Sequence, residues 1–429
     1  MPKMDRGSVT VSAIRVSPFI LLFYGVYTLV ALAVAYTTTL SLSDVLPAIL
    51  LMWALSGVFF VGELVAADRS LNRGERTPQR VSSWGAGPVI AVALIAAVMT
   101  IASVTYYSGA TPSVVWSNLT SGNSLYLDYQ EFNSDFGASG GVVGRVFVVL
   151  RVLSQLLTLY FFFTFAVVDR NLNWYRVTAL VILGFASLYG SLARGTTFEA
   201  FKLVLLVLFV LYARGVGSRR RFRGFAIAGA LSLAVFYFFR FNIAARGARQ
   251  SECLSLDVCR DSAGAFGPVI STVADVAELL YGYFGHGFFY ISTMLNRVVP
   301  NDLGGIQGWL VPENSFWASG SNALAAVENI IDMGPRWRPD SAIAIATYGF
   351  IGLIFIVALL GLIAGLLSRD RGPAGMIGLF VIVVQVLSLP VGNFVTVSTE
   401  YVAAVVMCGA WYLYSFVSRS RTSIAPRGV

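Results

Sequence analysis

Long apolar runs alternate with shorter polar segments along most of this chain. Many of the runs approach the roughly 20 residues that a helix needs to cross the hydrocarbon of a bilayer. The pattern therefore predicts about ten transmembrane helices, near residues 17–36, 45–65, 88–105, 143–167, 176–190, 199–213, 225–239, 342–367, 375–391 and 398–417.

Composition supports this interpretation and excludes a soluble globular protein. Hydrophobic residues make up 57% of the 429 residues, and charged residues only 12%. Soluble domains carry about twice that share of charge. The predicted fold class is an all-α polytopic integral membrane protein.

The positions of the basic residues set the expected orientation. If the N-terminus is cytoplasmic, 19 of the 30 Lys and Arg residues fall in cytoplasmic segments. The predicted outer loops at 37–44, 106–141 and 392–397 contain none. Because cytoplasmic loops collect Lys and Arg, both termini are expected in the cytoplasm. The net charge of +8 then reflects topology, and nucleic acid is not an expected partner.

The chain is expected to have three parts. Residues 1–239 contain the first seven transmembrane helices and an outer loop at 106–141. Residues 240–341 form a large extracytoplasmic loop, in which the half-apolar stretch 269–299 is expected to be an amphipathic or re-entrant helical segment. Residues 342–429 contain the last three helices and a cytoplasmic tail.

Two of the three cysteines lie in the large loop. Cys253 and Cys259 are six residues apart, so an oxidising compartment would allow a disulfide that closes a small loop. Two free thiols are the alternative. Cys408 falls in the last helix, where a small buried apolar role is expected.

Arginines on the predicted outer side are the main candidates for a functional site. Positive residues are depleted there, and a guanidinium group can bind phosphate through two parallel hydrogen bonds. The alternative is that each pairs with a loop carboxylate or a lipid headgroup. The set comprises Arg194, Arg240, Arg246, Arg249, Arg260, Arg297, Arg336 and Arg338.

Ionisable residues also occur inside the predicted helices. Arg151 is about two turns deep in the fourth helix, where a charge is costly unless it faces water or the bundle interior, so it is expected to line a cavity. Glu199 and Lys202 are spaced i, i+3 and are expected to pair.

His286 is the only histidine in the chain. It lies among aromatic residues and glycines in the segment 281–290, which includes Tyr281. Histidine accepts protons near neutral pH, and glycines allow close approach to a ligand, but a structural role is the alternative.

Several motifs are missing from the sequence. It has no Asp-x-Asp pair, His-Glu-x-x-His, P-loop or Gly-x-Ser-x-Gly. The expected chemistry therefore uses no metal and no cofactor.

Three stretches carry a resemblance to a known family. They are Ser191–Thr197, the Tyr-Gly-x-x-Gly-His-Gly segment around His286, and Trp337–Ser341 leading into Tyr348–Gly352. With the overall layout, they resemble the Wzy-type polymerases of bacterial O-antigen and capsule repeat units. One departure is Thr347-Tyr348, where that family often has an acidic residue before the glycine.

The resemblance implies a GT-C-like glycosyltransferase in the bacterial cytoplasmic membrane. Its substrate would be an undecaprenyl-pyrophosphate-linked oligosaccharide, polymerised at the outer face. His286 would orient or deprotonate the acceptor hydroxyl, and arginines would stabilise the leaving pyrophosphate. The implied catalytic residues are His286, Arg194 and Arg338, and the implied substrate-binding residues are Arg240, Arg246, Arg249, Arg297, Arg336, Tyr281 and Arg151.

Two other functions fit the same layout. An O-antigen ligase-like enzyme would use the same donor with another acceptor. A transporter or flippase for lipid-linked sugars would show inverted repeats and broken helices, and no repeat is visible here. Expected partners are the lipid-linked oligosaccharide, membrane lipids and, as an option, a chain-length regulator.

Overall fold

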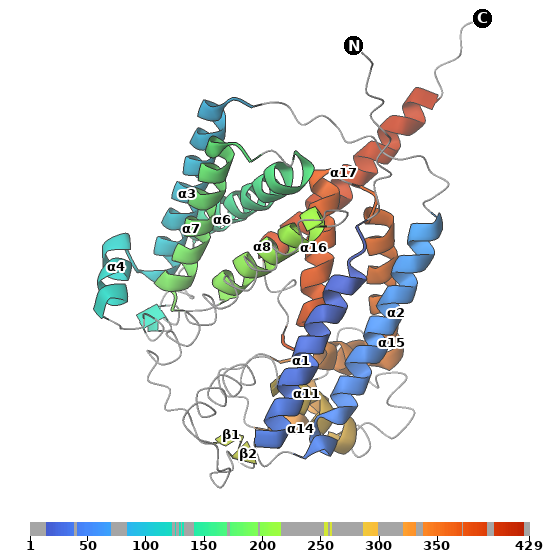
Figure 1. Cartoon of the computed structure of the whole chain (residues 1–429). Coiled ribbons are helices and arrows are strands. Elements are labelled where there is room, and N and C mark those ends of the chain that lie inside the picture. Colours follow the sequence, from blue (N-terminus) through green and yellow to red (C-terminus); the bar gives the residue numbers. More distant parts are fainter. Residues whose placement is uncertain are drawn as a thin grey trace, which may run out of the picture. The chain divides into compact units, whose positions relative to one another are not determined.

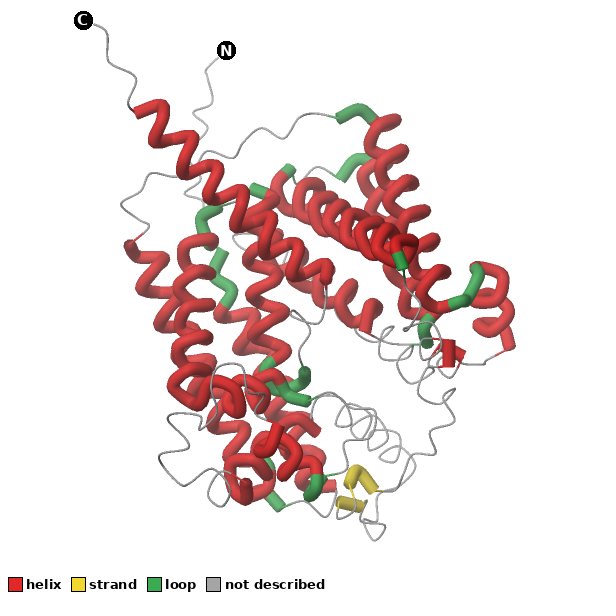
Figure 2. Tube along the Cα trace, turned by 180° about the vertical axis from the view of Figure 1, so that it is seen from behind, coloured by secondary structure: helices red, strands yellow, loops and turns green. Residues whose placement is uncertain are grey.

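A computed structural model gives the arrangement of the helices (Figures 1 and 2). The residues that it describes are 14–37, 41–69, 84–121, 125, 128–129, 131–132, 141–169, 172–195, 198–215, 253–255, 258–259, 286–298, 321–331, 338–370, 372–392 and 399–423.

The chain divides into two compact units. The first consists of residues 1–15, 74–246 and 367–377, and the second of residues 16–73, 247–366 and 378–429. Each unit is thus assembled from segments that are far apart in the sequence.

The first unit is a helical bundle in which α3 packs against α6 and α7. The contact surfaces are rich in alanine, including Ala93 and Ala97 on α3 and Ala179 and Ala186 on α7, all of them buried. Small residues allow membrane helices to approach closely. The elements are α3 (Ala86–Ser108), α4 (Pro112–Ser121), α6 (Val142–Phe161), the π-helical η3 (Phe162–Val168), α7 (Trp174–Ala193) and α8 (Phe198–Gly215).

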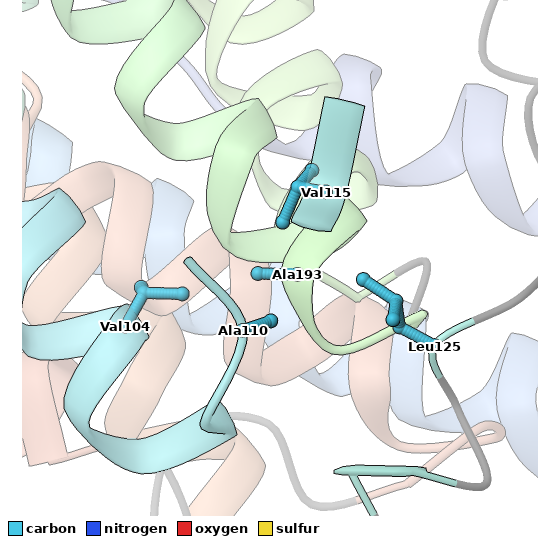
Figure 3. Close-up of a cluster of buried hydrophobic side chains, with 5 residues drawn as sticks. All are labelled: Val104, Ala110, Val115, Leu125 and Ala193. Atoms are coloured by element: carbon cyan, nitrogen blue, oxygen red, sulfur yellow. The ribbon is translucent and has the colours of Figure 1, made fainter. Parts of the chain in front are cut away.

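A small apolar cluster closes one end of this bundle, where α3 and α7 end (Figure 3). Its members are Val104, Ala110, Val115, Leu125 and Ala193. The chain leaves α3 through Gly109, whose φ of 68° favours glycine. The turn brings Val115 of α4 onto the end of α7.

The second unit contains the N-terminal helices and most of the C-terminal ones (Figure 1). Its elements are α1 (Ser17–Thr37), η1 (Leu42–Asp44), α2 (Leu46–Arg69), β1 (Cys253–Ser255), β2 (Val258–Cys259), α11 (His286–Thr293), the π-helical η5 (Met294–Val298), α14 (Ser321–Glu328), α15 (Asp340–Leu367), α16 (Pro373–Ser388) and α17 (Thr399–Ser423). Of α16, only the part from residue 378 onward belongs to this unit.

Glycines bring α2 and α15 into close contact. A β-carbon on Gly62 would lie 2.7 Å from the carbonyl oxygen of Ala358, and one on Gly361 would overlap the carbonyl of Phe59. Neither position has room for a side chain. The two helices therefore pack backbone against backbone, as membrane helices with small interface residues do.

Glu63 is a fully buried carboxylate within α2. One of its oxygens accepts a hydrogen bond of 2.7 Å from the backbone N–H of Val16. The other accepts from the backbone N–H of Ser17 at 3.1 Å and from the Ser17 hydroxyl. Glu63 thus caps the start of α1, where a negative charge also complements the helix dipole.

We expect Glu63→Ala to destabilise the protein by about 2–3 kcal/mol, because it leaves buried backbone donors without an acceptor. The measurement is the thermal unfolding midpoint of the purified protein in detergent. Asp68→Ala is the matched control, since Asp68 is an exposed carboxylate on the same helix and its loss should cost at most about 0.5 kcal/mol. Equal midpoints for the two variants would contradict the capping role.

The predicted apolar runs within the described residues are helices. Five of these helices are long and apolar enough to cross a membrane, namely Leu46–Asp68, Ala86–Ser108, Val142–Val168, Trp174–Ala193 and Asp340–Leu367. The protein is therefore a helical membrane protein, as predicted. The run at 225–239 lies outside the described residues, so the number of ten spans stays a prediction.

One of the spanning helices is interrupted. Within α15, Gly349 has φ 70° and ψ 178°, a backbone conformation that is not helical. Glycine adopts it without the steric cost that other residues incur. The nine residues before it and the longer segment after it are therefore two helical halves joined by a kink.

The described part of the predicted large loop is mostly helical, with the short strands β1 and β2 and a few turn residues. These strands pair antiparallel, with Cys253 opposite Cys259. The structure does not describe the side chains of these residues, so the disulfide between Cys253 and Cys259 stays a prediction. In the 269–299 segment, α11 is buried along almost its whole length and packs against α2.

Candidate functional site

The first candidate site is a charged cluster in the first unit, where α7 ends and α8 begins. Glu199 has only 7% of its side chain exposed and forms a hydrogen-bonded ion pair with Nη2 of Arg194. Nη2 of Arg151, from α6, lies 3.6 Å from the same carboxylate oxygen. Lys202, one turn further along α8, also acts electrostatically on Glu199.

Local chain geometry places these groups. The chain turns at Gly195, whose φ is 57°, so that Arg194 at the end of α7 faces the first turn of α8. Nε of Arg194 donates a hydrogen bond of 3.3 Å to the carbonyl of Gly190, one helical turn earlier. A β-carbon on Gly190 would lie 3.7 Å from Glu199 and 3.8 Å from Arg194, so a larger side chain would push into the ion pair.

Three positive side chains thus act on one carboxylate in this cluster. Glu199 reduces the cost of burying the arginines. Guanidinium groups recognise phosphate oxygens through charge-assisted hydrogen bonds. The chemistry of the cluster suits a multiply charged anion. We refer to Arg151, Arg194, Glu199 and Lys202 below as the arginine cluster.

The second candidate site lies in the second unit and begins with an ion pair. Arg338, just before α15, forms two hydrogen bonds to Glu328 at the end of α14, one of them 2.9 Å long. These hydrogen bonds raise the pKa of Arg338 above its usual range. The pair lies near Tyr290 of α11, whose pKa is raised by burial and by the Glu328 carboxylate, so its phenol stays protonated.

His286 begins α11 and is almost fully buried. The residue after it, Gly287, packs so tightly that a β-carbon there would overlap the carbonyl of Pro390 and lie 3.4 Å from Cγ of Pro339. The start of α11 is therefore wedged between the chain that enters α15 and the chain that leaves α16.

Asp340, the first residue of α15, is also buried, with 8% of its surface exposed. Its Oδ2 accepts a hydrogen bond from the side-chain amide of Gln385 on α16. Next to it, the backbone N–H and the hydroxyl of Ser341 both donate to the carbonyl of Leu389, at 3.0 and 2.8 Å. Three hydrogen bonds thus fix the start of α15 on the end of α16.

The predicted site residues fall into two groups and an undescribed remainder. Arg194 and Arg151 lie together in the arginine cluster, as members of the first unit. Arg338 and His286 belong to the second unit, and Arg297 is exposed on η5 there. Five predicted residues lie outside the described part of the chain: Arg240, Arg246, Arg249, Arg336 and Tyr281.

The contacts of Asp340, Gln385 and Glu328 could not be predicted from the sequence. A signal was present for the first two, since each is a polar residue in or beside a long apolar run. Such residues in membrane helices usually face other protein groups and often mark functional sites. The link between them spans 45 residues, and no local spacing rule connects them.

No group of three His, Cys, Asp or Glu side chains that could hold a metal ion occurs among the described residues. Metal independence stays a prediction. Comparisons with protein-family models, with curated proteins and with solved structures found no match to this chain. Any functional assignment therefore rests on the two sites themselves.

Proposed function

We propose that this protein is a glycosyltransferase of the cytoplasmic membrane of bacteria, one that polymerises polyprenyl-pyrophosphate-linked oligosaccharide repeat units as Wzy-type enzymes do. The observation that carries the proposal is the arginine cluster, in which Arg194 from the end of α7 and Arg151 from within α6 meet at the buried carboxylate of Glu199. A lipid-linked pyrophosphate is an anion of high charge that is presented at a membrane, so it suits such a cluster.

In this reaction the growing chain is transferred from its pyrophosphate carrier to a hydroxyl of the next lipid-linked unit. Negative charge develops on the leaving pyrophosphate, and arginines that are already in position stabilise it without reorganisation. Arg194 and Arg151, both in the first unit, would make these contacts. The roles predicted for Arg338, for the arginines outside the described residues and for His286, as the residue that orients the acceptor hydroxyl, stay part of the proposal.

The proposal includes the orientation predicted from the basic residues. Both termini would be cytoplasmic, and the segment 240–341 would face the outside. Arg194 and Arg338 would then lie on the side of the membrane where repeat units are joined. The expected partners are the lipid-linked oligosaccharide and membrane lipids, together with a chain-length regulator as an option.

One observation favours a second candidate, a transporter or flippase for lipid-linked sugars. Such carriers use interrupted membrane helices around their substrate, and α15 is interrupted at Gly349. The same break is compatible with an enzyme, because irregular backbone is tolerated wherever it lines a cavity. Only the glycan that the cell makes separates these functions.

The deciding experiment is deletion of the gene in the source strain, followed by gel analysis of its surface glycan. We expect a ladder of polymer to collapse to single repeat units, and a plasmid copy of the gene to restore the ladder. Loss of all surface repeat units would indicate a flippase instead. Long polymer that accumulates on the lipid carrier would indicate a ligase, and an unchanged ladder would contradict all three functions.

A further inference from the structure

Three carboxylates are buried among the described residues, namely Glu63, Glu199 and Asp340. Burial of a carboxylate is costly unless hydrogen bonds or positive charges compensate it. For Glu63 the compensation comes from the N-terminus of α1, and for Glu199 from arginines. Both are therefore explained by structure or by anion binding.

Asp340 differs from the other two. Its side chain accepts a hydrogen bond from the neutral amide of Gln385, and no basic side chain of the described residues forms an ion pair with it. An amide donor orients a carboxylate but does not neutralise it. A carboxylate that is held in place without a cation keeps the capacity to accept a proton from another group.

The surroundings hold Asp340 rigidly. Ser341 ties the backbone of the next residue to Leu389, and Pro339 packs against Gly287. His286 therefore starts α11 beside the segment that carries Asp340. Rigid support of this kind is what a proton acceptor needs, because small displacements of a reacting group cost much of the rate.

The break at Gly349 separates Asp340 from the longer half of α15. The segment 350–367, after Gly349, is about 27 Å long at 1.5 Å per residue, close to the roughly 30 Å thickness of the hydrocarbon layer. The half-helix 340–348 is therefore not needed to cross the membrane. The length of α15 is thus compatible with a position of Asp340 at the membrane surface, where an acceptor hydroxyl would have to reach it.

We propose that Asp340 is the catalytic residue that accepts the proton of the acceptor hydroxyl, and that Gln385 is its positioning residue. This inference rests on the proposed polymerase function. The acceptor oxygen bonds to the anomeric carbon of the donor sugar while its proton passes to Asp340. The bond from that carbon to pyrophosphate breaks, its electron pair leaves with polyprenyl pyrophosphate, and Asp340 then gives the proton to water.

The test uses the full chain, purified in detergent, with lipid-linked repeat units extracted from the deletion strain as substrate. Asp340→Asn is expected to lower kcat at least about 100-fold with KM within about twofold, because only proton transfer is lost. Asp340→Glu should recover part of the rate. Gln385→Leu should lower kcat about tenfold or more at constant KM, the effect of one hydrogen bond to a charged carboxylate.

A failure of the proposed function can be distinguished from a failure of the role assigned to Asp340. If the purified wild-type protein does not extend the lipid-linked units and the deletion strain still makes polymer, the proposed function itself is wrong. If the wild-type protein extends them and Asp340→Asn keeps its kcat, the role of Asp340 is wrong. Should Asp340→Asn not accumulate, Gln385→Leu and Asp340→Glu decide, and wild-type kcat in both would overturn the inference.

Discussion

Arg194→Ala is expected to reduce polymerised glycan at least about 100-fold, since it removes a positioned donor for the charge that develops on pyrophosphate. The protein should still accumulate, because Arg151 and Lys202 remain to balance the buried Glu199. Arg194→Lys should recover only part of the activity, because an ammonium group cannot make the paired contact of a guanidinium. The measurements are glycan chain length on a gel and protein level by immunoblot.

Arg145→Ala is the matched control for this experiment. Arg145 lies on α6, as Arg151 does, but its side chain is exposed near the start of the helix. Its replacement should leave the ladder unchanged. If Arg194→Ala gives a normal ladder at a normal protein level, the arginine cluster does not take part in the reaction.

Gly287→Ala is expected to destabilise the protein strongly, by about 3 kcal/mol or more. The added methyl group would overlap the carbonyl of Pro390, and both the start of α11 and the end of α16 are buried there. Relief of this overlap requires backbone movement, since a carbonyl cannot rotate away as a side chain can. The thermal unfolding midpoint of the purified protein measures the effect.

Gly57→Ala gives the comparison. Gly57 lies on α2, the helix on which α11 packs, and a β-carbon there would meet nothing within 4 Å. Alanine is favoured over glycine in a helix interior by about 1 kcal/mol, so this variant should unfold at the same temperature or a higher one. Similar midpoints for the two variants would show that the contact at Gly287 is not tight.

The long apolar runs predicted most of the long helices among the described residues. The run predicted at 88–105 is α3, and the run predicted at 342–367 is α15, each within about three residues. These boundaries are predictable because a membrane helix must bury its own backbone groups within an apolar segment of fixed minimum length. The break at Gly349 was not predicted, because the sequence there remains apolar on both sides.

The candidate sites were predictable only in part. Arg194 could be selected as an arginine on the predicted outer side, and Arg151 as a charge within a helix, where charge is costly. The contact of both arginines with Glu199 could not be predicted, since Arg151 and Glu199 belong to α6 and α8 and are 48 positions apart. The i, i+3 spacing pointed instead to Lys202 as the partner of Glu199. Packing of helices that are distant in the sequence decides such contacts.

Asp340 illustrates the same limit. Its residue type and its place before an apolar run were visible in the sequence, but its burial and its bond to Gln385 depend on how α15 meets α16. A solvated aspartate before a helix is commonly an N-terminal cap. Its surroundings in the fold are what distinguish it as a candidate proton acceptor.

The cap on α1 has a consequence for biosynthesis. The backbone donors at Val16 and Ser17 find their acceptor on Glu63, 47 residues after Val16 in the chain. At a translation rate of about 5–20 residues per second, that acceptor is made roughly 2–10 s later. The first helix is thus made before the acceptor for its leading turn, and its N-terminal cap is completed only when the second helix packs beside it.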